Sequence, residues 1–136
     1  EKISGNINVN LVEKKITKKT KALIVVHMAG FACDMNKIQK ICKKYKLQLI
    51  EDCAHGLGTF FSRRHVGNFG LSGCFSFYPT KHITTGEGGM LVSNSSELFA
   101  KAAAWHDHGH ENNPNVPRSP DNLIFKGGQK IVSERM

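Results

Sequence analysis

The chain has 136 residues, of which 40% are hydrophobic, and this length suffices for one domain with a buried core. Nineteen basic residues against eleven acidic ones give a formal net charge of +8 at pH 7. The sequence shows no signal peptide and no apolar run near the length of a membrane span. We therefore expect a soluble, cytoplasmic protein without a membrane partner.

The excess positive charge lies in two clusters, Lys14–Lys21 and Lys43–Lys46. Such clusters can bind nucleic acid or another anionic surface. Both clusters fall near predicted helix ends, however, where lysine interacts favourably with the helix dipole and stays solvated. We expect solvated faces and no nucleic-acid partner, with a basic anion-binding module as the alternative.

Four cysteines occur without the C-x-x-C spacing that is typical of zinc and redox sites. They lie among apolar residues, and a cytosolic protein keeps its thiols reduced. We expect four buried thiols, without disulfides and without a zinc site. These residues are Cys33, Cys42, Cys53 and Cys74.

The first predicted elements are a short helix and a buried strand. Asn8 or Asn10 can cap a helix whose apolar residues recur at helical spacing up to Ile16. The run 22–28 is apolar without alternation, which is typical of a parallel strand that is covered on both faces. Gly30 ends this strand.

The segment that follows predicts a β-α-β unit. Asp34 is a good N-cap, and the helix from there to Tyr45 has its apolar residues on one stripe. The strand Leu47–Glu51 comes almost directly after this helix. Asp52 therefore stands at the carboxyl end of a parallel strand, which is the edge where ligands of open α/β sheets bind.

The second half of the chain predicts a hairpin, two strands and a helix. Residues 59–66 have turn residues at their middle and form the hairpin, while Gly73–Phe77 and Gly89–Ser93 form the strands. The sequence Asn94–Glu97 matches a capping box for the next helix. The residues expected to face inward on that helix are Leu98, Phe99, Ala102 and Trp105.

From Asp107 onward the sequence predicts an irregular, exposed loop, because three prolines lie between positions 114 and 120. His106, His108 and His110 alternate at the start of this loop and are a candidate metal cluster. Alternate histidines in a loop lack a defined fourth ligand, so we expect no metal site.

The most informative stretch runs from Phe75 to Gly89 and contains a single lysine, Lys81. Pro79 fixes φ and removes a backbone donor just before this lysine, so the chain must turn off the preceding strand. Glycines at 86, 88 and 89 let the backbone pass close to a bound group. A lysine that is shielded from solvent in such a place can lose its proton near neutral pH and attack a carbonyl. The alternative is a surface lysine in a turn.

Two segments carry a resemblance to a known family. They are Glu51-Asp52-x-Ala-His55-x-x-Gly and Ser76-Phe-x-x-x-Lys81-x-x-x-x-Gly-Glu-Gly-Gly. Together they resemble the DegT/DnrJ/StrS family of sugar aminotransferases, which use pyridoxal phosphate on the fold-type-I aminotransferase scaffold. The resemblance runs from about Ile7 to Gly109. It implies an α/β fold with a mostly parallel sheet and flanking helices.

The resemblance also implies how much of the family architecture is present. Family chains are much longer, with a large cofactor domain and a smaller C-terminal domain. Residues 1–136 then correspond to a partial, central piece of the large domain, and residues 107–136 to an irregular loop and a truncated C-terminal end. The resemblance thus implies that the small domain is not part of these residues.

Four residues acquire roles from the resemblance. Asp52 falls where the family aspartate faces the pyridine nitrogen of the cofactor and keeps it protonated through its opposite charge. Lys81 matches the lysine that forms the internal aldimine and later shuttles a proton. Ser76 matches a position whose hydroxyl binds the cofactor phosphate. His55 falls where the family has glutamine or histidine near the phenolic oxygen.

Each of these assignments has a structural alternative. Asp52 can cap the turn after its strand, Ser76 can be satisfied by the backbone, and His55 can be merely structural. Glu51 alternates to the other face of the strand, which makes it the weaker candidate for an acid at the site.

The resemblance implies transfer of an amino group, from glutamate or glutamine, to a ketosugar attached to a nucleotide. A sugar 3-dehydratase of the same family is one alternative, but that enzyme carries histidine at the position of Lys81. A non-catalytic truncated domain or a basic anion-binding module is the other. We expect this piece alone to bind pyridoxal phosphate poorly and to turn over little. Its parent protein would act as a homodimer with sites shared across the interface.

Overall fold

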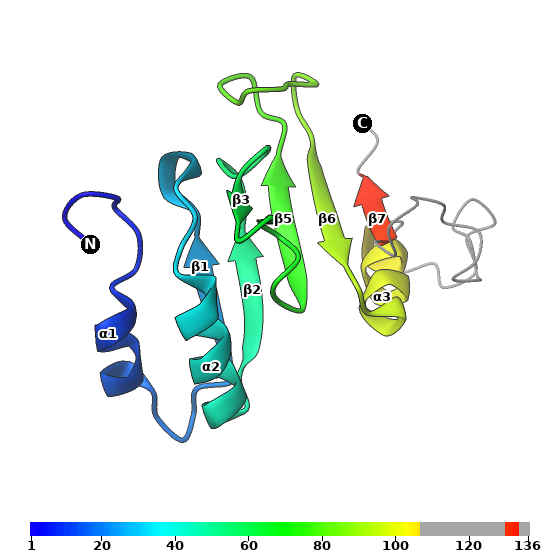
Figure 1. Ribbon diagram of the computed structural model, residues 1–136. Helices are drawn as coiled ribbons and strands as arrows, with labels where there is room; N and C mark the ends of the chain where they lie inside the picture. Colours follow the sequence, from blue (N-terminus) through cyan, green and yellow to red (C-terminus); the bar gives the residue numbers. More distant parts are fainter. Residues whose placement is uncertain (107–129, 134–136) are drawn as a thin grey trace.

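The computed structural model describes residues 1–106 and 130–133, and their main feature is a five-stranded sheet (Figure 1). In spatial order the strands are β1 (Ala22–Val26), β2 (Gln48–Asp52), β5 (Ser72–Ser76), β6 (Gly89–Ser93) and β7 (Lys130–Ser133). β2 is parallel to β1 and to β5, whereas β6 runs antiparallel to β5 and β7 antiparallel to β6. Four of the five described strands therefore run in one direction, which confirms the expected mostly parallel α/β sheet.

β1, the helix α2 (Met35–Tyr45) and β2 form the expected β-α-β unit. The predicted N-cap of α2 is confirmed, because Asp34 Oδ1 accepts a hydrogen bond from the Lys37 amide at 3.1 Å. The helix ends at Lys46, whose left-handed φ of 53° turns the chain towards β2. The strand begins one residue later than predicted and includes Asp52 as its last residue.

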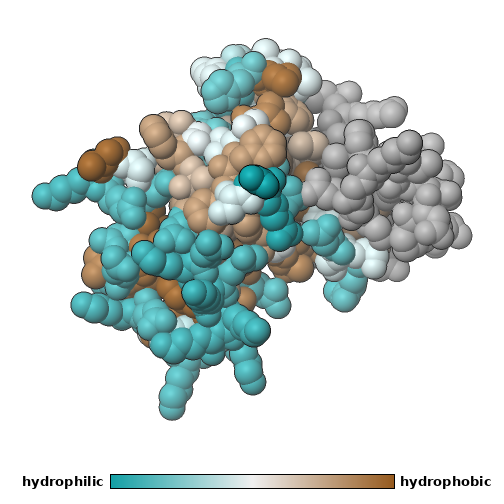
Figure 2. Space-filling model, viewed as in Figure 1, coloured by the Kyte–Doolittle hydropathy of each residue, from teal (hydrophilic) through white to brown (hydrophobic). Residues whose placement is uncertain are grey.

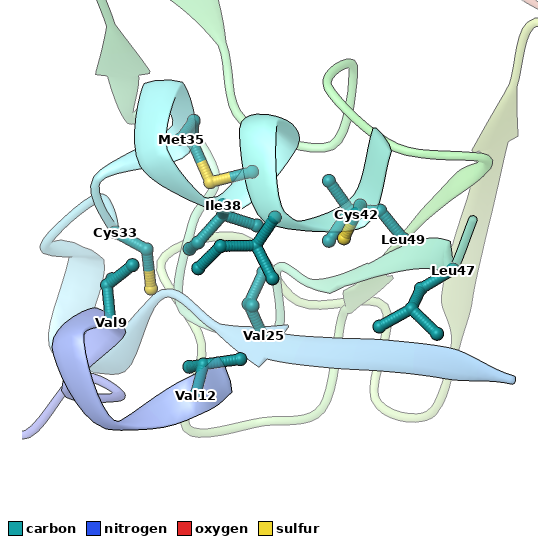
Figure 3. Close-up of a cluster of buried hydrophobic side chains, with 10 residues drawn as sticks. Val9, Val12, Val25, Cys33, Met35, Ile38, Cys42, Leu47 and Leu49 are labelled. Atoms are coloured by element: carbon teal, nitrogen blue, oxygen red, sulfur yellow. The ribbon is translucent and has the colours of Figure 1, made fainter. Parts of the chain in front are cut away.

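The larger hydrophobic core lies between α2, the first two strands and the N-terminal helix (Figure 3). The apolar stripe of α2 packs onto Val25 of β1 and Leu49 of β2, which share one face of the sheet because strand side chains alternate. Each fully buried side chain of this size contributes about 1.5–3 kcal/mol to folding. The buried members of the core are Val9, Val12, Val25, Cys33, Met35, Ile38, Ile41, Cys42, Leu47 and Leu49.

The N-terminal helix consists of α1 (Val9–Val12) and the 3-10 turn η1 (Glu13–Lys15). Its cap is Asn8, whose side chain accepts a hydrogen bond from the Asn10 amide at 3.1 Å. This contact decides between the two asparagines that the sequence offered. Ile16 follows the helix as a half-buried residue that packs against the core.

β1 ends two residues earlier than predicted, and the 3-10 turn η2 (Met28–Gly30) follows it. The chain leaves the extended conformation because Ala29 and Gly30 have left-handed φ angles of 50° and 82°. His27 lies between the strand and the turn, with its side chain fully buried. Its amide donates to the Asp52 carbonyl at 3.1 Å, which continues the pairing with β2 by one bond.

β3 (Phe60–Phe61) and β4 (Arg64–His65) pair antiparallel and confirm the hairpin predicted over 59–66. Ser62 and Arg63 form its two-residue turn with φ angles of 48° and 66°. Positive φ at both central residues matches the twist of the flanking strands, although residues other than glycine and asparagine adopt it rarely. The hairpin follows β2 and lies beside the end of that strand (Figure 1).

α3 (Ser96–His106) differs from the prediction in its cap and in its buried side. The Oγ of Ser95, and not the side chain of Asn94, caps the helix by accepting a hydrogen bond from the Leu98 amide at 3.1 Å. The inward orientation predicted for Trp105 is wrong, because this side chain is 83% exposed. α3 contacts β6 and β7. Phe99 is buried as predicted, and Leu98 and Ala102 are half-buried. The buried residues are Phe99, Ala103 and Ala104.

All four thiols are free, but only three of them are buried as predicted. Cys74 is exposed, which corrects the prediction for this residue. It is the register partner of Asp52, and both side chains point to the face of the sheet opposite to the one that α2 covers. A buried thiol was expected there because the neighbouring residues in sequence are apolar, although they belong to the other face.

The lysine clusters lie at helix ends, as predicted. Lys43 and Lys44 occupy the last turn of α2, and Lys14 and Lys15 the last turn of η1. Lys44 Nζ lies 3.1 Å from Glu13 Oε2 and joins the two elements on their exposed side. Figure 2 shows hydrophilic residues gathered over this part of the molecule, in the lower part of the view.

Residues 107–129 and 134–136 lie outside the described residues. Most of the loop predicted from Asp107, including His108 and His110, falls there, and so does the predicted truncated end. Within the same stretch the structure describes the strand β7, where the sequence predicted irregular structure. None of the helices in the described part of the chain has the length and apolar character needed to span a bilayer.

Candidate active site

The carboxyl edge of β2 and β5 brings two of the predicted site residues to one face of the sheet. Asp52 is the register partner of Cys74, and the two strands are parallel. Ser76 follows Cys74 by two residues, so its side chain points to the same face as that of Asp52. Both side chains are half-buried. A ligand that lies over this face can therefore reach a carboxylate and a hydroxyl.

A hollow of about 320 Å³ opens beside these residues, between β5, β6 and the end of α3. Its lining includes Cys74 and Gly89. Cys74 is the register partner of Asp52, and Gly89 is the register partner of Ser76. The hollow is thus lined by the register partners of the two candidate site residues, and not by Asp52 or Ser76 themselves.

Lys81 lies in the connection between β5 and β6, which leaves the sheet at the edge where β2 also ends (Figure 1). This connection is closed at its base, because the Phe77 amide donates to the Gly88 carbonyl at 2.9 Å. The Lys81 amide donates to the Tyr78 carbonyl at 2.9 Å, so a tight turn precedes the lysine as predicted. The Lys81 side chain is half-buried, while its sequence neighbours are exposed.

The glycines after Lys81 shape this connection. Gly86 and Gly88 have φ angles of 83° and 152°, a region that favours glycine. A Cβ atom on Gly88 would also collide with the Thr85 hydroxyl. The bend that the sequence predicted after the lysine is therefore confirmed.

Asp52 has one carboxylate oxygen engaged and one available. Its Oδ1 accepts a hydrogen bond from the Ala54 amide at 3.0 Å, so the turn-capping interpretation is correct for this oxygen. Among residues 1–106, no protein donor lies within hydrogen-bond distance of Oδ2. An aspartate in this state can cap its turn and still bind a cationic nitrogen.

Ser76 and His55 likewise use one polar atom for a hydrogen bond to the nearby backbone and keep another that can bind a ligand. Ser76 Oγ accepts a hydrogen bond from the Tyr78 amide at 3.3 Å, which leaves its O–H to be donated. His55 Nδ1 accepts from the Ala29 amide at 3.4 Å, which puts the ring hydrogen on Nε2. Both side chains therefore have the structural contacts that were the alternative to a role in cofactor binding. Their roles towards a cofactor stay predictions.

Glu51 is the residue whose importance the sequence reasoning missed. It is fully buried on the face of β2 that packs towards α2. Its Oε1 accepts hydrogen bonds from the amides of Phe69 and Gly70 at 2.6 and 2.8 Å. Its Oε2 accepts from the Gly67 amide at 2.7 Å and lies 3.2 Å from His27 Nε2. Four donors thus surround one carboxylate.

These donors decide the charge of Glu51. Burial by itself raises the pKa of the carboxyl group, while the hydrogen bonds lower it, and the net shift of the pKa is downward. The group is therefore ionised at neutral pH. A signal for this arrangement existed in the sequence: an acid inside a buried strand, followed by a loop with glycines at 67, 70 and 73 that can offer free amides.

His27, Glu51 and Cys53 are also the group with the geometry of a candidate metal site, since their ligand atoms lie within 4.8 Å of one another. The polar atoms are already used, however. His27 Nδ1 accepts a hydrogen bond from the Cys33 amide at 3.2 Å, so Nε2 carries the ring hydrogen and donates it to Glu51. Burial raises the pKa of the Cys53 thiol and keeps it protonated. The arrangement is a hydrogen-bonded part of the core.

Comparison with known proteins identifies the family. The sequence profile of the DegT/DnrJ/EryC1/StrS aminotransferase family matches residues 1–121. The chain belongs to this family. The match confirms the family that was inferred from the segments around Asp52 and Lys81, and it extends beyond the stretch from Ile7 to Gly109 that carried the resemblance.

Three members of the DegT/DnrJ/EryC1/StrS family illustrate the similarity. GDP-perosamine synthase of Vibrio cholerae is 45% identical over 106 residues, which are 78% of this chain and 29% of the synthase. The structure of Helicobacter pylori PseC, an aminotransferase involved in the biosynthesis of pseudoaminic acid, is 42% identical with a TM-score of 0.76. That match covers 78% of this chain and 29% of PseC. A GDP-4-keto-6-deoxymannose-3-dehydratase with a trapped PLP-glutamate geminal diamine is 31% identical with a TM-score of 0.77, covering 85% of this chain and 30% of the dehydratase.

The chain thus spans about 29% of the length of these relatives. Their structural similarity confirms the predicted fold class, an α/β fold with a mostly parallel sheet and flanking helices. The roles of Asp52, His55, Ser76 and Lys81, and the division into domains, stay predictions.

Proposed function

We propose that this chain forms part of the cofactor site of an enzyme that uses pyridoxal phosphate to transfer an amino group to a nucleotide-linked ketosugar. The observation that best supports this proposal is the common edge of the sheet at which Asp52, Ser76 and the Lys81 connection lie. A carboxylate, a hydroxyl and an amine at one edge suit the ring nitrogen, the phosphate and the aldehyde of this cofactor. The names of the perosamine synthase and of PseC support an amino sugar as product.

In such a site each of the four candidate side chains would contact a different part of the cofactor. Pyridoxal phosphate supplies the electron sink when it is bound. The free carboxylate oxygen of Asp52 would bind the pyridine N–H and keep this nitrogen protonated. The Ser76 hydroxyl would donate to the phosphate, and the Nε2–H of His55 would donate to the phenolic oxygen. The Lys81 amine would hold the cofactor and then move a proton between the carbon of the amino donor and that of the cofactor.

Glutamate or glutamine is the amino donor that we propose. The dehydratase structure with a trapped PLP-glutamate adduct supports glutamate, because it contains this donor bound to the cofactor in a similar fold. The parent protein would act in the cytoplasm as a homodimer, a part of the proposal that rests on the family resemblance. Since the chain spans about 29% of its relatives, we expect weak cofactor binding and little turnover from these residues alone.

The dehydratase reaction is the second candidate, because a sugar 3-dehydratase is among the similar structures. The family resemblance gives that enzyme a histidine where this chain has Lys81. A primary amine can bond covalently to a carbonyl group of the cofactor, and we therefore favour amino transfer. Incubation of the parent protein with a nucleotide-linked ketosugar and glutamate separates the two reactions, since one yields an amino sugar and the other a deoxy sugar.

Covalent labelling tests the proposal on the chain itself. The chain is incubated with pyridoxal phosphate, reduced with borohydride and digested, and the modified lysines are identified by mass spectrometry. We expect modification of Lys81 to exceed that of every other lysine, and to disappear in Lys81→Ala. Lys43→Ala is the matched control, because Lys43 is an exposed lysine at the end of α2 and its loss should leave the labelling of Lys81 unchanged.

A second result would contradict the proposal. Modification spread evenly over the surface lysines, to the same extent in Lys81→Ala, would leave only a non-catalytic domain. Salt-dependent binding to nucleic acid without the Lys81 label would favour the basic anion-binding module.

A further inference from the structure

The buried carboxylate of Glu51 holds the loop 67–70 tightly against the sheet. Three backbone amides of this loop donate hydrogen bonds to Glu51, which restricts the motion of the loop. Its glycines lie so close to the sheet that a side chain would not fit there. A Cβ atom on Gly70 would collide with the Leu49 carbonyl, and one on Gly67 would come within 2.9 Å of the Phe75 ring. The loop thus packs on β2 and β5 by backbone contact, with Glu51 as the centre of its hydrogen bonds.

The same carboxylate holds the end of β1 through His27. The His27 ring is bound on both sides, by Glu51 at Nε2 and by the Cys33 amide at Nδ1. Its main chain is bound on both sides as well, since its amide donates to the Asp52 carbonyl and its carbonyl accepts from the Gly30 amide at 3.2 Å. His27 therefore determines where the turn η2 leaves the strand.

The turn η2 in turn contacts His55. The Ala29 amide donates to His55 Nδ1, which selects the ring form with hydrogen on Nε2. Gly30 lies against the same residue, because a Cβ at Gly30 would come within 3.3 Å of the His55 carbonyl. The Gly30 carbonyl also accepts from the Thr59 hydroxyl at 2.9 Å. A continuous set of hydrogen bonds therefore runs from Glu51 through His27 and η2 to His55.

We propose that Glu51 and His27 are positioning residues for the candidate site, fixing from the opposite face of the sheet where Asp52 and His55 stand. Asp52 follows Glu51 directly in β2, and its carbonyl accepts a hydrogen bond from the His27 amide. The backbone of Asp52 is therefore linked to Glu51 on one side and to His27 on the other, and these two side chains contact each other. This inference rests on the proposed function only for what the site binds. The hydrogen-bonded path itself is independent of any cofactor.

Two substitutions separate the parts of this path. Glu51→Gln keeps the size of the side chain but replaces one of its two acceptor oxygens with an NH₂ group. That group faces either Phe69 and Gly70 or Gly67 and His27, so the loop loses an acceptor in both orientations and His27 loses one in the second. His27→Asn keeps an acceptor for the Cys33 amide and removes the donor to Glu51, so the loop 67–70 keeps its hydrogen bonds. We expect faster amide exchange at Gly67, Phe69 and Gly70 in the first variant and not in the second.

The readout that a merely structural pair would not change is the ring of His55. Nitrogen NMR of the imidazole distinguishes hydrogen on Nδ1 from hydrogen on Nε2, and we expect the Nε2–H form to be lost in part in both variants. We also expect the Kd for pyridoxal phosphate to rise roughly ten- to a hundred-fold, because a displacement of about 1 Å at a site has effects of this size. Ile38→Val is the control, since Ile38 is equally buried but its side chain makes none of these hydrogen bonds.

The results distinguish the inference from the proposed function. If the unmodified chain shows no preferential label on Lys81, the proposed function fails, and the His55 spectra and amide exchange still test the positioning. Folded Glu51→Gln and His27→Asn variants with the original His55 spectrum would overturn the inference. So would a Kd within two-fold of that of the unmodified chain, or an equal rise in Ile38→Val. If Glu51→Gln does not fold, the His55 spectrum and the Kd for pyridoxal phosphate of His27→Asn test the inference.

Discussion

Two adjacent carboxylates in β2 have opposite surroundings. Glu51 points into the core and accepts hydrogen bonds from four N–H groups, whereas Asp52 points to the open face and accepts one from Ala54. The difference follows from the alternation of side chains along a strand. Only Asp52 can therefore meet a ligand directly, and Glu51 can influence the site only through the backbone and its hydrogen-bonded neighbours.

Cys74 is the thiol for which we predict fast reaction. Cys33, Cys42 and Cys53 are buried, and burial raises the pKa of Cys33 to about 11. Cys74 is exposed, although partial burial and the charge of Asp52 raise its pKa as well. In the folded chain we expect one thiol to react with a disulfide reagent, at a rate that increases with pH, and the other three to react only after unfolding.

The assignment of this fast thiol is checked by substitution. Cys74→Ser should remove the fast reaction, and Cys42→Ser should leave it unchanged. Reaction of two or more thiols at the same rate in the folded chain would show that the described burial is wrong.

At the scale of elements, the β-α-β unit carries most of the core. α2 supplies four of its buried side chains, and its start depends on one local contact, the hydrogen bond from the Lys37 amide to Asp34. Local signals of this kind can be read in a sequence because donor and acceptor are three residues apart. α3 shows a different case, since the spacing within the helix predicted that Trp105 faces inward and this side chain is exposed.

We predict that Asp34→Ala lowers the free energy of unfolding by about 1 kcal/mol, because an orphan amide of α2 loses its acceptor. Asp34→Asn should lose much less, since the amide oxygen of asparagine also caps helices. Urea unfolding followed by circular dichroism measures both. Equal losses in the two variants would indicate that the exposed ion pair with Lys37, and not the cap, is what matters.

At the scale of the whole molecule, Glu51 joins the end of β1, the strand β2 and the loop before β5 through one charge. Its folded pKa lies below the ordinary value of 4.5. The unfolded chain therefore binds a proton more readily than the folded chain, and the stabilisation is complete above about pH 4.5. It is lost as the pH falls through the lowered pKa.

This linkage predicts a difference between two acid titrations. Unfolding free energies measured in urea between pH 7 and pH 3 should fall more steeply for the unmodified chain than for Glu51→Gln, so the gap between them narrows at low pH. A constant gap over this range would mean that the pKa of Glu51 is the same in the folded and the unfolded chain, and that the surrounding donors do not hold its charge as described.

Features that depend on neighbours in the chain could be predicted from the amino-acid sequence. The helix cap at Asp34, the hairpin over 59–66, the turn before Lys81 and the two family segments are all of this kind, and each concerns residues a few positions apart. The family and the α/β fold followed from them.

The burial and the hydrogen-bond partners of individual side chains became known from the three-dimensional structure. The four donors around Glu51 come from residues 27 and 67–70. Cys74 is exposed although its neighbours in the chain are buried, and Trp105 is exposed although its spacing predicted an inward orientation. The physical reason is the same in each case. Burial and hydrogen bonding of a side chain are set by segments that lie far away in the sequence, and periodicity within one segment contains no information about them.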